Sequence, residues 1–162
     1  SLAICGFISS LSGGLISDYF EKKNKRAKSI VCMFSSFMAF PLTAACCLNQ
    51  GSFWFSIIAI TLKTLLSGGF SSPAITMMQN TTSSKDQGNI ISSHMFYTTI
   101  VATLTPILFG LVSNIFGAAS DPKIYGYVLT LFAGLGYWGS IPFWFLAGKS
   151  YEKYMIEQEK DN

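Results

Sequence analysis

Residues 53–77 read FWFSIIAITLKTLLSGGFSSPAITM, a long apolar run in which the only charged side chain is that of Lys63. A helix needs about 20 apolar residues to cross the roughly 30 Å hydrocarbon layer of a membrane, because each residue adds about 1.5 Å. A backbone in lipid must also satisfy its own hydrogen bonds, which favours a helix over an open strand. The run therefore predicts a membrane-spanning helix.

Four further stretches of the chain meet the same requirement, and polar or charged loops separate them. They cover residues 2–17, 30–48, 90–116 and 124–147. None of the stretches alternates between apolar and polar residues, as the strands of a membrane β-barrel do. We therefore expect an all-α, polytopic transmembrane bundle of five spans over residues 1–148, followed by a cytoplasmic tail at residues 149–162.

The composition agrees with this interpretation. Of the 162 residues, 50% are hydrophobic and 12% are charged, whereas a soluble domain carries about 25% charged residues. The charges gather at residues 18–28 and 149–161. A nucleic-acid-binding protein, a disulfide-rich secreted module and a disordered tail are poor matches to this distribution, so nucleic acid is not an expected partner.

The basic residues predict the orientation of the bundle. They cluster in the loop after the first span, in the loop after the third span and in the tail, whereas the other loops carry only Lys123. Basic loops stay in the cytoplasm, so we expect these segments and the C-terminus on the cytoplasmic side of an integral, multi-pass membrane protein.

The loop after the first span carries a short motif. Residues 14–26 read GLISDYFEKKNKR, with a glycine, an aspartate four residues later and then a basic cluster. This order resembles the cytoplasmic loop signature of the major facilitator superfamily, in the copy that joins the eighth and ninth helices. Tyr19 and Glu21 depart from the family pattern, in which a basic residue and a glycine are usual. The resemblance implies a partial major-facilitator fold, helices eight to twelve of a twelve-helix transporter.

The resemblance also implies roles for residues of this loop. Gly14, Asp18 and Arg26 would form a gating motif. Gly14 would let another helix approach closely, and Asp18 would meet the positive N-terminus of a helix in the missing half and latch one state. The alternative is a basic loop that sets topology and binds anionic lipid headgroups.

Two further stretches are similar to the spinster-like branch of this superfamily. They are GGFSSP at residues 68–73 and TPILFG at residues 105–110. Glycine and proline in spans are places where helices bend, as a transport cycle requires. The chain starts at Ser1 directly with an apolar stretch and without the charged leader of a signal peptide, so we interpret it as the C-terminal part of a longer protein.

Lys63 is the main candidate for binding a solute. It lies about 15 Å from the start of its helix, close to the bilayer centre, where a lysine costs at least about 2.5 kcal/mol. No acidic residue lies within any of the five stretches. Lys63 would then bind an anionic group of the solute, with Ser67 and Phe70 on the same helix face. The alternatives are a structural lysine that pairs with a distant carboxylate, and a lysine that snorkels out of a tilted helix.

Histidine, cysteine and aromatic residues are the other side chains with relevant chemistry. His94, at the cytoplasmic end of the fourth span, is a candidate for proton coupling, and the alternative is a simple hydrogen bond to a neighbour. The four cysteines have no metal-ligand spacing, so we expect no metal and no cofactor. The aromatic residues of the last span, Tyr137 and Trp144 among them, are interpreted mostly as anchors at the membrane interface and as lipid-facing side chains.

The sequence therefore predicts a secondary active transporter, present here in part, that moves a small or amphipathic anionic solute by alternating access. Its partners would be membrane lipid, the solute, and a missing N-terminal half or partner subunit. The alternative is a truncated, non-transporting membrane protein that serves as a scaffold or partner subunit. An enzyme is not expected, because the spans contain no aspartate pair, His-Glu motif or Ser-His pair.

Overall fold

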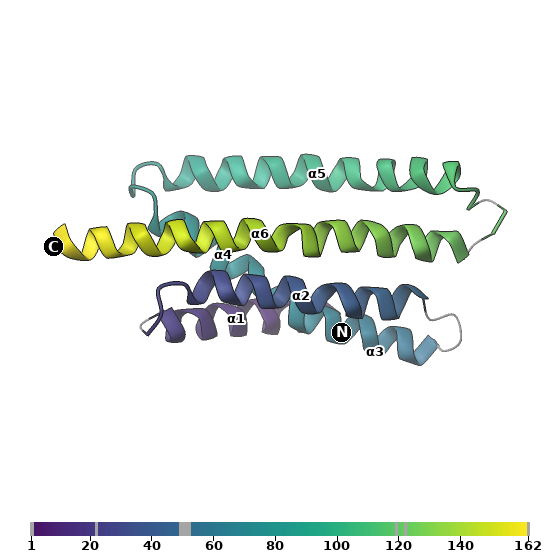
Figure 1. The fold of residues 1–162 in the computed structure, drawn as a ribbon, viewed down its shortest axis with the longest axis horizontal. Helices are drawn as coiled ribbons and strands as arrows, with labels where there is room; N and C mark the ends of the chain where they lie inside the picture. The colour runs from purple at the N-terminus through teal and green to yellow at the C-terminus, as the bar shows by residue number, and fades with distance from the viewer. Residues whose placement is uncertain (1, 22, 49–52, 119, 122, 162) are drawn as a thin grey trace.

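The computed structural model describes residues 2–21, 23–48, 53–118, 120–121 and 123–161. Every element in these residues is helical (Figure 1). The elements are α1 (Leu2–Glu21), α2 (Ala27–Leu48), α3 (Phe53–Ser67), the short 3-10 helix η1 (Gly68–Phe70), α4 (Ser71–Asn80), α5 (Gln87–Ile115) and α6 (Lys123–Asp161). The predicted polar turn at residues 49–52 and Lys22 of the basic loop lie outside the described residues.

Five helical segments of the described chain are long and apolar enough to cross a membrane. They are Ala3–Glu21, Ala27–Leu48, Phe53–Asn80, Gln87–Ile115 and Lys123–Lys160. Each contains most or all of one stretch that the hydropathy pattern predicted. The prediction of an all-α chain with five helices of membrane-spanning length is confirmed.

The helices lie side by side as long rods, and the connections alternate between the two ends of the bundle (Figure 1). The α1–α2 connection, the α4–α5 connection and the C-terminal end of α6 gather at one end, which we call the charged end. The α5–α6 connection lies at the opposite end. The three basic segments thus share one end, as the charge pattern requires, while the assignment of that end to the cytoplasm stays a prediction.

The contact between α2 and α6 is the most extensive one between the described helices. Glycines of α6 make it close: a Cβ on Gly126 would lie 2.6 Å from the backbone oxygen of Cys47, and one on Gly148 would collide with Ser29. The Trp138 ring packs on Phe40 with centroids 4.5 Å apart. Small residues that let backbones approach are the usual means of packing helices in lipid.

The third span is helical throughout but is not one continuous α-helix. Pro73 has no N–H to donate to the carbonyl of Gly69, and the α-helix changes to the 3-10 helix η1 at this point. The hydroxyl of Ser9 in α1 donates to the carbonyl of Leu65 in the last turn of α3. Residues 53–77 therefore form two α-helices joined at the glycine–proline run, where the sequence indicates bending.

The last helix continues without a break through the predicted tail. Its 39 residues correspond to about 58 Å, which is longer than the roughly 30 Å hydrocarbon layer. The part of α6 beyond residue 148 is therefore a helical extension at the charged end, and its role as a cytoplasmic tail stays a prediction.

Candidate functional site

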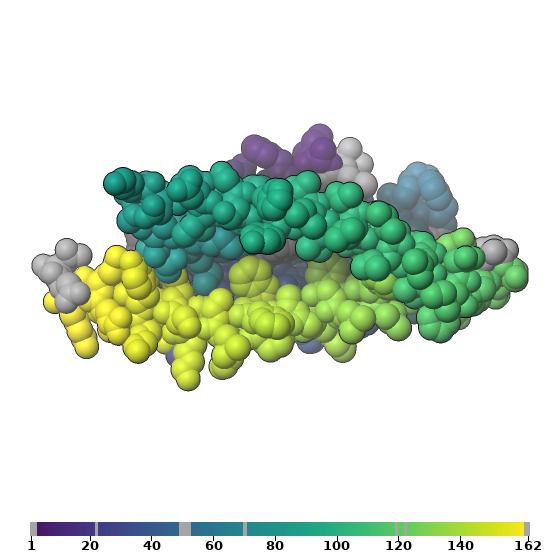
Figure 2. All heavy atoms as spheres, turned by 90° about the horizontal axis from the view of Figure 1, so that it is seen from above, coloured from purple at the N-terminus to yellow at the C-terminus, as the bar shows by residue number. Residues whose placement is uncertain are grey.

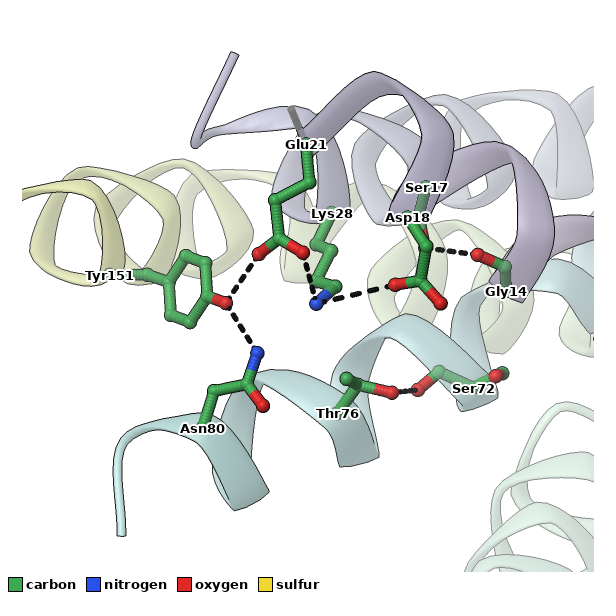
Figure 3. Close-up of polar contacts among 9 residues, drawn as sticks. All are labelled: Gly14, Ser17, Asp18, Glu21, Lys28, Ser72, Thr76, Asn80 and Tyr151. Carbon is green, nitrogen blue, oxygen red and sulfur yellow. Dashed lines mark hydrogen bonds and ion pairs between the residues drawn. The ribbon is translucent and has the colours of Figure 1, made fainter. Parts of the chain in front are cut away.

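A network of polar side chains joins four helices at the charged end (Figure 3). Its centre is Lys28 at the start of α2, whose side chain is only 1% exposed. The Nζ atom of Lys28 lies 2.6 Å from Glu21 Oε2 and 3.3 Å from Asp18 Oδ1, both near the end of α1. A buried lysine is tolerated when its charge is paired, and two carboxylates supply that pairing here.

Tyr151 of α6 connects this network to the third span. Its hydroxyl donates to Glu21 Oε1 over 2.5 Å and accepts from Asn80 Nδ2 over 2.8 Å. The ring of Tyr151 also lies near Lys28, with 5.9 Å between Nζ and the ring centroid. We call Asp18, Glu21, Lys28, Asn80 and Tyr151 the charged cluster, which links α1, α2, α4 and α6.

The three residues of the expected gating motif occupy different positions around this cluster. Gly14 lies against α4, because a Cβ there would be 2.7 Å from Ser72 Oγ. Asp18 pairs with Lys28 of its own chain while its side chain stays 59% exposed. Arg26 does not join Asp18 but pairs with Glu152 of α6, with Nε 2.6 Å from Oε2. Lys25 pairs with Glu159 in the same way, so the basic loop is tied to the end of α6.

Lys63 lies in a different place and lines a cavity of about 660 Å³ between α2, α3, α5 and α6. Hydroxyl groups and aromatic rings make up much of the remaining wall: Ser36, Thr43, Thr105, Phe132, Tyr137, Ser140 and Trp144. The Nζ atom of Lys63 lies 5.6 Å from the centroid of the Tyr137 ring, at the distance of a cation–π contact. Among the residues that the structure describes, no ion pair includes Lys63.

The two other residues assigned to the solute site are not seen beside Lys63. Ser67 is buried at 5% exposure and is not among the described residues that line the cavity. Phe70 is part of η1, and its side chain lies outside what the structure describes. Tyr137 and Trp144 line the cavity instead of serving only as interface anchors. The aromatic character of these two residues does not predict a position in the cavity wall, because that position depends on how α6 packs.

His94 is half-buried on α5 and does not line the cavity itself. The hydroxyl of Thr98 donates to the His94 backbone carbonyl. Thr98 and Thr105 follow His94 by four and by eleven residues, which places all three on one face of the helix. Because Thr105 lines the cavity, His94 lies on the face of α5 that leads from the cavity toward the charged end.

The described residues form neither a candidate metal site nor a disulfide. No group of three or more His, Cys, Asp or Glu residues there could hold a metal ion. None of the four cysteines forms a disulfide.

The five candidate spans indicate an integral, multi-pass membrane protein. No family model, curated protein or solved structure matches this chain.

Proposed function

We propose that this chain forms part of a secondary active transporter of the major-facilitator type, which moves a small or amphipathic anionic solute by alternating access. The observation that carries the proposal is the position of Lys63: deep in the third span, on the wall of a cavity, and outside every ion pair of the described residues.

The energetics of Lys63 support a solute role. A lysine near the bilayer centre costs at least about 2.5 kcal/mol, so such residues usually face a cavity and mark a solute or ion pathway. The contact with the Tyr137 ring offsets part of that cost, by about 2 kcal/mol when the charge is desolvated. An anionic group bound at Nζ would add a charge-assisted hydrogen bond.

The wall of the cavity indicates the kind of anion. Its volume of about 660 Å³ lies within the range of about 300–1,000 Å³ that is typical of small-molecule sites. The hydroxyl of Ser36 can donate to a polar head, whereas those of Thr43 and Ser140 already donate to backbone carbonyls of their own helices. Phe132 and Trp144 offer an apolar surface. This mixture suits an amphipathic anion such as a lysolipid phosphate or an aromatic carboxylate.

Two further features support a conformational change in the third span. The change from α3 through η1 to α4 gives the third span a place to bend, between Lys63 on one side and Asn80 on the other. Asn80 belongs to the charged cluster, so a bend at η1 would connect the cavity to the polar contacts at the charged end.

Uptake into vesicles tests the proposal. The chain, reconstituted with the segment or subunit that completes its pathway, is given lysophosphatidate or the zwitterionic lysophosphatidylcholine. We expect uptake of the anionic lipid, its loss in Lys63→Ala and its partial retention in Lys63→Arg. Lys85→Ala, which removes an exposed lysine of the α4–α5 connection, is the matched control. Unchanged uptake in Lys63→Ala would remove Lys63 from the solute site.

One observation favours the second candidate, a non-transporting scaffold or partner subunit. Only Ser113 is buried among the described residues of α5, and apolar side chains such as Phe96, Val101 and Leu108 are more than half exposed. Figure 2 shows α5 uncovered along its length beside α6. A partner helix could cover this face. This second function would be supported by a membrane protein that co-purifies with the chain and is lost in Val101→Glu, together with uptake that does not depend on Lys63.

A further inference from the structure

A second cavity, of about 480 Å³, lies between α1 and α2, and we call it the α1–α2 groove. The second half of α1, the first half of α2 and the end of α3 form its walls. These walls are mainly apolar and include Ile16, Phe20, Ile30, Val31, Phe34 and Leu65. The inner end of the groove lies at Ser9 and Gly69, where α1 and the third span are in close contact.

The depth of the groove matches one leaflet of a membrane. Ser9 and Phe20 are eleven residues apart on α1, which corresponds to about 16 Å along the helix axis. Half of the roughly 30 Å hydrocarbon layer is about 15 Å. The groove thus extends from the charged end of the bundle to about the bilayer centre, as an acyl chain of that leaflet does.

The volume of the groove is sufficient for one hydrocarbon chain. A chain that runs along the roughly 16 Å of the groove lies against a mainly apolar wall over its whole length.

The mouth of the groove lies at the α1–α2 connection, which is rich in basic residues. Asn24 and Ala27 line it there, and the exposed Lys23 precedes Asn24. The neighbouring cations are already paired: Lys25 with Glu159, and Arg26 with Glu152. No ion pair of the described residues includes Lys23, so its charge is available to an anion at the mouth.

We propose that the α1–α2 groove binds one acyl chain of an anionic membrane phospholipid, with the lipid phosphate against Lys23. The acyl chain contributes to recognition only through its shape, because it gains no hydrophobic free energy by leaving other lipids. The preference for an anionic headgroup comes from Lys23, since a basic residue near the surface attracts anionic lipid. This site is separate from the Lys63 cavity and does not depend on transport.

Lipid retention tests the site. The purified chain in mild detergent is incubated with equal amounts of phosphatidylglycerol and phosphatidylcholine, washed, and weighed by native mass spectrometry. We expect one retained phosphatidylglycerol per chain, preferred over phosphatidylcholine about fivefold. Equal retention of the two lipids, or no retained lipid, overturns the proposal.

A matched pair of variants locates the acyl chain. Val31→Trp fills the groove, whereas Val101→Trp makes the same change at an exposed position on α5. We expect at least fivefold less retained phosphatidylglycerol in Val31→Trp and no change in Val101→Trp. The smaller pair Val31→Met and Val101→Met repeats the comparison if the tryptophan prevents folding. Equal retention in both members of a pair that folds overturns the groove as the site.

A second matched pair locates the headgroup. Lys23→Gln and Lys85→Gln each remove one exposed lysine at the charged end, so neither change disturbs the packing of the bundle. We expect Lys23→Gln to abolish the fivefold preference for phosphatidylglycerol and Lys85→Gln to keep it. The same loss in both variants would mean that the overall charge of this end attracts the lipid, and would overturn the assignment to Lys23.

Discussion

The Nζ atom of Lys28 lies 2.6 Å from Oε2 of Glu21, across the connection between α1 and α2, and the two side chains are only 1% and 18% exposed. Glu21 accepts a second hydrogen bond from the hydroxyl of Tyr151 on α6. One carboxylate therefore neutralises a buried cation and also holds a distant helix. Removing one partner of a buried ion pair leaves an uncompensated charge, which costs more than removing both.

Glu21→Ala is expected to lower the free energy of unfolding by about 3 kcal/mol, because Lys28 then keeps only Asp18. The double variant Glu21→Ala/Lys28→Ala should lose clearly less than the sum of the two single variants. Titration of the purified chain with SDS, followed by circular dichroism, measures these differences. Asp18→Ala is the comparison, and its effect should be smaller because Asp18 is 59% exposed. Additive single losses would contradict the pairing.

Tyr151→Phe removes the hydroxyl that connects Glu21 to Asn80 and keeps the ring. We expect a loss of about 1–2 kcal/mol in the same SDS titration, because the half-buried carboxylate of Glu21 loses a charge-assisted hydrogen bond and the Asn80 amide loses its acceptor. Tyr154→Phe removes a hydroxyl that accepts a hydrogen bond from the exposed Gln158 side chain, so its effect should stay below about 0.5 kcal/mol. Equal effects would show that Tyr151 does not connect the helices.

Gly148→Ala should separate α2 from α6. The new methyl group would collide with the side chain of Ser29, whose hydroxyl donates to the Trp144 carbonyl. Such overpacking costs about 1–3 kcal/mol. Gly136→Ala is the control, because nothing lies within 4 Å of its added methyl group. The thermal midpoint of the helical signal in detergent should fall for Gly148→Ala and not for Gly136→Ala.

The orientation of the bundle can be measured by labelling introduced cysteines with a membrane-impermeant maleimide. Because the basic segments lie at one end, Ser84→Cys and Lys153→Cys should react from the same side, and the positive-inside rule makes that side cytoplasmic. Ser120→Cys, in the α5–α6 connection, should react only from the other side. Labelling of Ser84→Cys and Ser120→Cys from one side would contradict the five-span topology.

The helices and the grouping of the basic segments follow from local signals. Long apolar runs are sufficient to predict spans, and the charged loops are sufficient to predict that they share an end. The partners of the charged cluster could not be predicted, because Glu21 and Tyr151 are 130 residues apart and meet only through the packing of α6. One signal was available: Asp18 and Glu21 are spaced to share a helix face, close in sequence to Lys28.

The cavity around Lys63 likewise combines one feature that the sequence predicts with others that depend on helix packing. The sequence indicates a lysine deep in the membrane without an acidic partner in the spans, and the structure places it in a cavity. Helical spacing alone predicts Ser67 on that wall. Most of the wall comes instead from α2, α5 and α6, whose relative positions depend on small residues such as Gly126 and Gly148.

We expect the Tyr137 ring to position Lys63 in the proposed solute site. Tyr137→Phe keeps an aromatic face under Nζ, so the KM for lysophosphatidate should change less than twofold. Tyr137→Leu keeps an apolar side chain but removes the face, and the loss of about 1–2 kcal/mol corresponds to a KM raised about fivefold to thirtyfold. The two variants are compared by uptake into the same vesicles at several solute concentrations. Because both lack the hydroxyl, a difference between them isolates the contact between the ring and the ammonium group. Equal KM values would mean that Lys63 is positioned by something other than this ring.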